Sequence, residues 1–124
     1  MIEKKNFYIN GKWVSPVKPN DFDVIDPSTE EAFAVISLGS IEDTDKAVSA
    51  AKVAFETWRE TSKEERVKLL EKFCEIYNRR WDEMVEAQSM EMGAPLDFAS
   101  EIHTKMGADT VSYTHLRAHE TEYD

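Results

Sequence analysis

Alternating apolar and polar residues near the start of the chain predict short strands, because successive side chains of a strand point to opposite faces. The dipeptide Asn10-Gly11 interrupts this pattern, and both of its positions tolerate the positive φ that a two-residue hairpin turn requires. The apolar residues that flank it are Phe7, Ile9, Trp13 and Val14. Residues Phe22–Asp26 and Ala32–Ser37 predict a second hairpin, around the turn sequence Pro27–Glu31.

From Ser40 onward the apolar residues recur at the spacing of a helix. Ser40 and Asp43 have the spacing of a capping pair, and we expect the helix to end near Arg59. One face of this helix carries Ala47, Val48, Ala51, Ala54, Phe55 and Trp58. Such a face is typical of a helix that packs on a core.

A second helix is predicted to begin after Ser62, which has the capping-box spacing with Glu65. Its apolar stripe consists of Leu69, Leu70, Phe73, Ile76 and Tyr77. After a break near Asn78–Asp82 the pattern continues through Trp81, Met84, Val85, Gln88 and Met92. Gly93 and Pro95 then predict a helix end, because Gly adopts the left-handed conformation and Pro cannot donate the next backbone hydrogen bond. Beyond Pro95, a further helix is predicted from the apolar residues Leu96, Phe98, Ile102 and Met106.

Four ordered blocks of this sequence carry a resemblance to a known family. They are Phe7–Val14, Val24–Glu30, Ala47–Phe55 with Trp58, and Glu91–Pro95. In order and spacing they resemble the N-terminal part of an aldehyde dehydrogenase, from about Phe7 to Val111. The resemblance implies an α+β fragment of the three-layer α/β aldehyde dehydrogenase fold, with two N-terminal β-hairpins followed by three or four α-helices. It also implies that residues 1–111 are an incomplete, N-terminal part of the cofactor-binding domain.

The resemblance implies an NAD(P)-dependent oxidoreductase that converts an aldehyde to a carboxylate. In this family a cysteine thiolate attacks the aldehyde, hydride passes to NAD(P)⁺, and a glutamate activates the water that releases the acid. We identify none of these catalytic residues here, and no glycine-rich phosphate-binding motif is present. We therefore expect the complete enzyme to use NAD or NADP, and this chain alone to bind neither and to be inactive. Its implied partner is the remainder of an aldehyde dehydrogenase chain, in a parent enzyme that is a homo-oligomer.

The reactive side chains of the sequence are poor candidates for catalysis. Cys74, the only cysteine, lies between Phe73 and Ile76 on a predicted amphipathic helix, with no helix start or glycine-rich loop to activate it, so we interpret it as a packed thiol. His103 is a lone histidine on a predicted helix and is interpreted as structural or solvated. His115 and His119 have an i,i+4 spacing that would suit a metal, but without a third ligand the spacing is better explained as coincidence.

Glu91 stands at the acidic position before the Gly-x-Pro reversal. In the resembled family some members bind a monovalent cation through that carboxylate and a backbone carbonyl, and the matching carbonyl here is that of Ile25. Hard cations do prefer oxygen ligands. The alternative is a solvated or capping glutamate near a helix end, as we interpret Glu64 and Glu65 in the first turn of the second helix.

The amino-acid composition limits the classes of binding partner and the cellular compartment that we expect. The chain has 124 residues, 41% of them hydrophobic and 32% charged, and no apolar run approaches the roughly 20 residues of a membrane span. A net charge of -10 without a basic stripe disfavours nucleic acid as a partner. The charged residues at positions 1–6 differ from a secretory signal, so we expect a cytoplasmic protein without membrane attachment.

In the end of the sequence, Ser112–Asp124, the helical spacing weakens and the apolar continuation typical of the resembled family is absent. Its residues resemble a string that arises when sequencing-adapter DNA is translated, so we expect residues 112–124 to be a non-native or disordered tail. An unusual native terminus is the alternative.

One hypothesis from a different class accounts for the missing catalytic groups. The chain could be a small acidic standalone protein-interaction module whose amphipathic helices bind a partner protein. The two hairpins and the four ordered blocks have no use in such a module, and they favour the aldehyde dehydrogenase interpretation.

Overall fold

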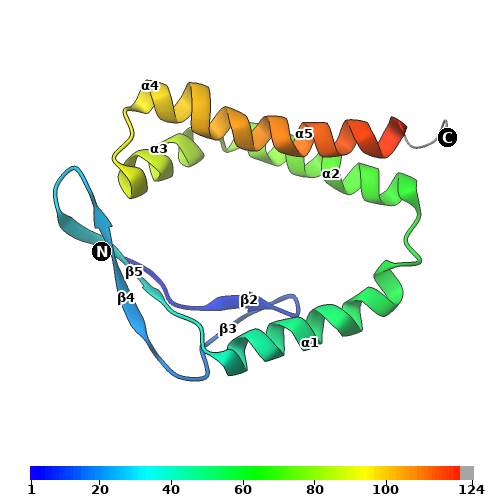
Figure 1. Cartoon of the computed structure of the whole chain (residues 1–124), viewed down its shortest axis with the longest axis horizontal. Coiled ribbons are helices and arrows are strands. Elements are labelled where there is room, and N and C mark those ends of the chain that lie inside the picture. Colours follow the sequence, from blue (N-terminus) through cyan, green and yellow to red (C-terminus); the bar gives the residue numbers. More distant parts are fainter. Residues whose placement is uncertain (121–124) are drawn as a thin grey trace. The chain divides into compact units, whose positions relative to one another are not determined.

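The structure is a computed structural model that describes residues 1–120, with the side chains of residues 1–114. The chain forms two compact units, residues 1–60 and 61–124. The first unit contains five strands and α1, and the second contains α2 to α5 with the π-helix η1 (Figure 1). Among the described residues no helix has the length and hydropathy of a membrane span.

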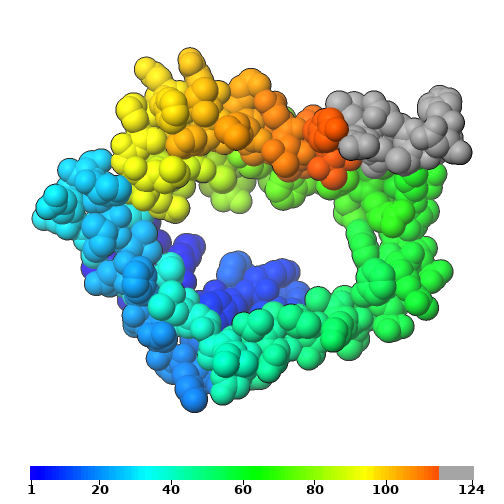
Figure 2. All heavy atoms as spheres, in the orientation of Figure 1, coloured from blue at the N-terminus to red at the C-terminus, as the bar shows by residue number. Residues whose placement is uncertain are grey.

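The first predicted hairpin is confirmed. Strands β2 (Phe7–Ile9) and β3 (Lys12–Val14) pair antiparallel, with Phe7 opposite Val14 and Ile9 opposite Lys12. Asn10 and Gly11 form the turn with φ of 54° and 72°, the positive values that this dipeptide predicts. The hairpin lies beside α1 (Ile41–Trp58), where β2 contacts the helix (Figures 1 and 2).

The second predicted hairpin is also confirmed, and it belongs to a three-stranded sheet. Strand β4 (Asp21–Asp26) pairs antiparallel with β5 (Glu31–Ser37), and a bulge lies between Val24 and Ile25. The sequence analysis did not predict β1 (Ile2–Lys4), which pairs parallel with the other side of β5. A charged segment gives no strand pattern by itself, and its partner lies about 30 residues further along the chain. The central strand β5 holds the buried residues of this unit's sheet, Ala34, Val35 and Ser37.

Both predicted capping boxes are present. At α1 the amide of Asp43 donates to Ser40 Oγ (3.3 Å) and the amide of Ser40 donates to Asp43 Oδ2 (2.9 Å). At α2 (Lys63–Arg79) the amide of Glu65 donates to Ser62 Oγ (3.2 Å) and that of Ser62 to Glu65 Oε2 (3.4 Å). Helix α1 ends at the predicted place, since Arg59 is its C-cap residue.

The predicted break after α2 separates it from α3 (Trp81–Met92) at Arg80. Gly93 ends α3 with φ of 67°, as its glycine predicts, and its amide donates to the carbonyl of Ser89 (2.9 Å). The helix predicted after Pro95 is present in three parts, α4 (Leu96–Phe98), η1 (Ala99–Thr104) and α5 (Lys105–Glu120). The π-helical segment was not predicted.

The core of the second unit lies where α2 and α3 contact η1 and α5, and its most buried residues are Val67, Ala99 and Thr104. Helix α5 continues past Ser112 to Glu120, whereas Thr121–Asp124 and the side chains of His115 and His119 lie outside the described residues. Whether residues 112–124 are native stays a prediction.

Candidate functional site

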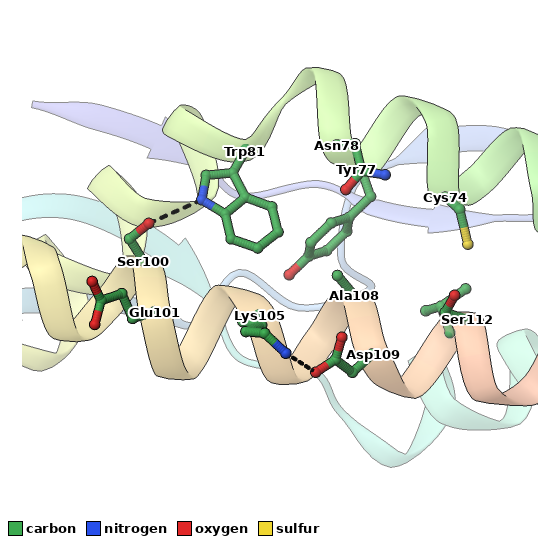
Figure 3. Close-up of a pocket in the computed structure, with 11 residues that line it drawn as sticks. Cys74, Tyr77, Asn78, Trp81, Ser100, Glu101, Lys105, Ala108, Asp109 and Ser112 are labelled. Atoms are coloured by element: carbon green, nitrogen blue, oxygen red, sulfur yellow. Dashed lines mark hydrogen bonds and ion pairs between the residues drawn. The ribbon is translucent and has the colours of Figure 1, made fainter.

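An open groove of about 520 Å³ lies within the second unit, between α2 and the η1–α5 segment (Figure 3). Cys74, Tyr77, Asn78 and Trp81 line it from the α2–α3 side. The opposite side carries Ser100, Glu101, Lys105, Ala108, Asp109, Val111 and Ser112. These residues recur at helical spacing, so one face of the η1–α5 segment forms that wall.

Two hydrogen bonds connect the two walls of the groove, and one ion pair lies on a single wall. The indole Nε1 of Trp81 donates to Ser100 Oγ (3.1 Å), and the hydroxyl of Tyr77 donates to the carbonyl of Thr104 (3.0 Å). Lys105 and Asp109 form an ion pair at 2.6 Å (Figure 3). Because both side chains of that pair are largely exposed, the pair stabilises little and leaves the groove open to water.

Cys74 lies on the groove but lacks the surroundings of a nucleophile. It is a free, half-buried thiol in the C-terminal half of α2, far from the helix N-terminus whose dipole would favour a thiolate. The cation that also lines the groove, Lys105, is held by Asp109. This geometry supports the interpretation of Cys74 as a packed thiol.

His103 lies on η1 and is half-buried. Its ring meets Phe98 edge to face, with centroids 5.0 Å apart. Among the described residues no three His, Cys, Asp or Glu side chains come together as a group that could hold a metal ion. His103 therefore packs against Phe98, which agrees with its interpretation as a structural histidine.

The two proposed cation ligands are in different units, so the cation site stays a prediction. Glu91 is exposed on the last turn of α3, next to the reversal at Gly93. In that reversal Ser89 Oγ donates to the carbonyl of Ala94 (2.8 Å). Ile25 pairs with Ala32 of β5, next to the register shift at which β5 contains one extra residue, Phe33.

The N-termini of α1 and α2 do not fit the phosphates of a dinucleotide. A phosphate site at a helix start needs free backbone amides. At α1 the carboxylate of Asp43 accepts hydrogen bonds from the amides of Ser40 and Val17, both at 2.9 Å. At α2 the carboxylate of Glu65 occupies the corresponding position. A phosphate at either end would meet a carboxylate, so these residues do not fit NAD or NADP.

The hydrogen bonds to Asp43 also set its ionisation. The backbone amides of Ser40 and then of Val17 donate to its carboxylate and lower its pKa below the ordinary value, while desolvation opposes them. Asp43 thereby ties the loop at Val17 to the start of α1. Sequence spacing predicts only the local half of this arrangement, the pairing with Ser40.

Sequence reasoning missed the groove. It assigned Tyr77 and Trp81 to apolar stripes, whereas the structure places Tyr77 near the end of α2 and Trp81 at the start of α3, on either side of Arg80. Their hydrogen bonds reach residues 27 and 19 positions further along the chain. No local pattern signals contacts of that range.

Comparison with known proteins identifies relatives over most of the chain. The model of the aldehyde dehydrogenase family matches residues 13–123. A 3-succinoylsemialdehyde-pyridine dehydrogenase from Pseudomonas sp. is 45% identical over 96 residues, which are 77% of this chain and 20% of that relative. The chain thus spans about a fifth of the length of this curated relative.

Solved structures give the same result. The crystal structure of an aldehyde dehydrogenase from Bartonella henselae superposes with a TM-score of 0.94 at 51% identity, covering 97% of this chain and 25% of that one. Aldehyde dehydrogenase C from Pseudomonas syringae, a mutant solved with NAD⁺ and octanal, gives 0.87 at 36% identity, covering 90% and 23%. The predicted fold class is confirmed, and nothing in these comparisons supports an acidic interaction module.

Proposed function

Because this chain belongs to the aldehyde dehydrogenase family, we propose that it supplies the first strands and helices of an NAD(P)-dependent enzyme that oxidises an aldehyde to a carboxylate. The observation that carries this proposal is the family match over residues 13–123 in a chain that spans about a fifth of its relative. A segment of this size contributes scaffold, and the reacting groups belong to the remainder of the enzyme.

The exposed apolar side chains support the proposal that this chain is a scaffold segment covered by the remainder of the enzyme. Phe55 is 57% exposed on α1 and Phe73 is 52% exposed on α2, although both belong to predicted core-facing stripes. Exposed apolar faces of this kind are typical of surfaces that another element covers. In the proposed enzyme the remainder of the aldehyde dehydrogenase chain covers them.

The cofactor, the assembly and the compartment are proposed on the basis of the family. The relative from Pseudomonas syringae was solved with NAD⁺, which supports NAD or NADP as the hydride acceptor of the complete enzyme. We propose a homo-oligomeric, cytoplasmic enzyme that binds neither nucleic acid nor membrane. Glu91 and the carbonyl of Ile25 are its proposed ligands for a monovalent cation.

This chain alone is expected to have no aldehyde dehydrogenase activity. Aldehyde oxidation in this family needs a thiolate, a hydride acceptor beside it and a base, and Cys74 has no activating surroundings. We expect no NAD(P)H from short aliphatic, aromatic or semialdehyde substrates, and no NAD⁺ binding by calorimetry. Cys74→Ser should leave both results unchanged. Turnover that this substitution abolishes would contradict the assignment of Cys74 and the proposal of an incomplete enzyme.

The cation site is tested in the complete enzyme. If the Glu91 carboxylate binds Na⁺ or K⁺, Glu91→Gln should abolish the dependence of thermal stability on these ions at constant ionic strength, because the neutral amide is a weaker ligand. Glu86→Gln, an exposed glutamate of the same helix, is the matched control and should keep that dependence. An ion response that is the same in both variants would refute the site.

A further inference from the structure

The π-helix η1 is held at both ends by hydrogen bonds from other helices. A π-helix takes more residues per turn than an α-helix, and such segments are rare. Trp81 donates to Ser100 near the start of η1, and Tyr77 donates to the carbonyl of Thr104 at its end. Tyr77, near the end of α2, and Trp81, the first residue of α3, pack edge to face, with centroids 6.3 Å apart and an interplanar angle of 85°. The two donors therefore act as one unit.

The approach of the Tyr77 phenol depends on a missing side chain. A Cβ at position 107 would lie 2.5 Å from the Tyr77 hydroxyl oxygen and 3.2 Å from its Cζ. Glycine is a poor helix former, yet Gly107 lies inside α5. The close approach gives a physical reason for it, since any larger residue would displace the phenol from Thr104.

The side chain of Thr104 favours the α-helical register over the π-helical one. Within residues 1–114, three threonines donate from their hydroxyls to the carbonyl four residues earlier, namely Thr44 to Ser40 (3.2 Å), Thr110 to Met106 (2.8 Å) and Thr114 to Thr110 (3.0 Å). Thr104 is fully buried, and within the described part of the chain its Oγ1 has no hydrogen-bond partner. An α-helical turn would offer it the carbonyl of Ser100, which the widened π-turn displaces.

We propose that Tyr77 and Gly107 form a register lock that holds η1 as a π-helix against a competing α-helical register. The unpaired hydroxyl of Thr104 is a cost of the π register. The hydrogen bond from Tyr77 to the carbonyl of the same residue offsets it. The balance between the two contacts makes the segment two-state, a conformational property that goes beyond the scaffold role proposed above.

The lock decides which side chains line the groove. A π-turn inserts one residue, so the α register would rotate everything beyond Thr104 by one position. Val111 and Ser112 both line the groove now; in the α register Val111 would take the position of Ser112, and Thr110 that of Val111. Lys105 and Asp109 would likewise move from their present positions. The two registers therefore place different residues of α5 next to Cys74, and the distance from Cys74 to each of these residues distinguishes the registers.

Crosslinking from Cys74 measures the register. Cys74 is the only cysteine of the chain, so one added cysteine gives one possible crosslink. Two full-length variants are prepared, one with Ser112→Cys and one with Val111→Cys, and each is treated with a short bis-maleimide. The ratio of the two crosslinking yields is recorded. Tyr77→Phe removes one hydrogen bond, and we expect it to shift this ratio toward position 111 by about fivefold. Tyr8→Phe, on the exposed hairpin of the other unit, is the control and should leave the ratio unchanged.

Two further variants separate a register lock from a simple stabilising contact. Gly107→Ala expels the phenol and should shift the ratio in the same direction as Tyr77→Phe. Thr104→Val keeps the shape of the side chain but removes the unpaired hydroxyl, so it should restore the original ratio in the Tyr77→Phe protein. A ratio that Tyr77→Phe leaves unchanged, or that Thr104→Val does not restore, would overturn the proposal.

Discussion

At the scale of single residues, Asp43 connects the start of α1 to a distant loop. It is 5% exposed, and its carboxylate accepts from Ser40 and from the amide of Val17, which lies 26 positions earlier. The local bond caps the helix, while the second bond is a tertiary contact. One carboxylate thereby couples helix formation to the packing of its unit.

The lowered pKa of Asp43 predicts a loss of stability in acid. A carboxyl whose folded pKa lies below its ordinary value of 3.8 stabilises the fold above that value, and this stabilisation disappears as the pH falls through the folded pKa. Asp43→Asn should lower helicity at neutral pH and flatten its acid titration, measured by circular dichroism. Asp45→Asn, an exposed aspartate of the same helix, is the control. Equal titration curves for Asp43→Asn and the unmodified chain would contradict the prediction.

At the scale of elements, the helix ends are set by individual residues. The two capping boxes begin α1 and α2, and Gly93 ends α3 in the left-handed conformation. Each cap provides hydrogen-bond partners for backbone groups that would otherwise lack them at a helix terminus. The start of α2 and the end of α3 thereby bound the α2–α3 side of the groove, and Pro95 follows directly after the reversal at Gly93.

Gly93→Ala tests the end of α3. A Cβ at a φ of 67° costs about 1 kcal/mol, which corresponds to about fivefold faster hydrogen exchange of the last amides of α3. Gly39→Ala is the matched control, because a Cβ there would lie 3.7 Å from the nearest atom of Phe7, an ordinary contact. Unchanged exchange in the Gly93→Ala protein would show that the left-handed cap does not hold the helix end.

At the scale of the whole molecule, each unit buries few large side chains. Among the side chains that the structure describes, the buried apolar residues are Ala34, Val35, Val67 and Ala99, whereas Trp13, Phe55, Trp58 and Phe73 are exposed. Burial of large apolar side chains is the main source of folding stability. The chain by itself is therefore short of a core, as expected of a segment that the remainder of an enzyme covers.

We expect the isolated chain to self-associate or to be loosely packed, with binding of a dye specific for apolar surface. Phe55→Gln with Phe73→Gln should reduce dye binding, measured by fluorescence, and shift light scattering toward the monomer. Lys52→Gln with Lys68→Gln, two exposed residues of the same helices, is the control and should not. A monodisperse monomer with a sharp cooperative melt and no bound dye would instead favour a protein that is complete on its own.

Local sequence patterns are sufficient to predict the turns and helix ends of this protein. Asn10-Gly11, Ser40 with Asp43, Ser62 with Glu65, and Gly93 act on their own backbone or on residues within one turn, so spacing predicts the hairpin, the helix starts and the helix end. The ordered blocks likewise predicted the family. Both results depend on chain order alone.

Only the tertiary structure decided the rest, because those features join segments far apart in the sequence. The parallel pairing of β1 with β5 and the bond from Val17 to Asp43 have no local pattern. The π-helix needs the phenol of Tyr77, which approaches through the space left by Gly107. Helical periodicity predicts a continuous α-helix there, and contacts from a neighbouring helix stabilise the other register.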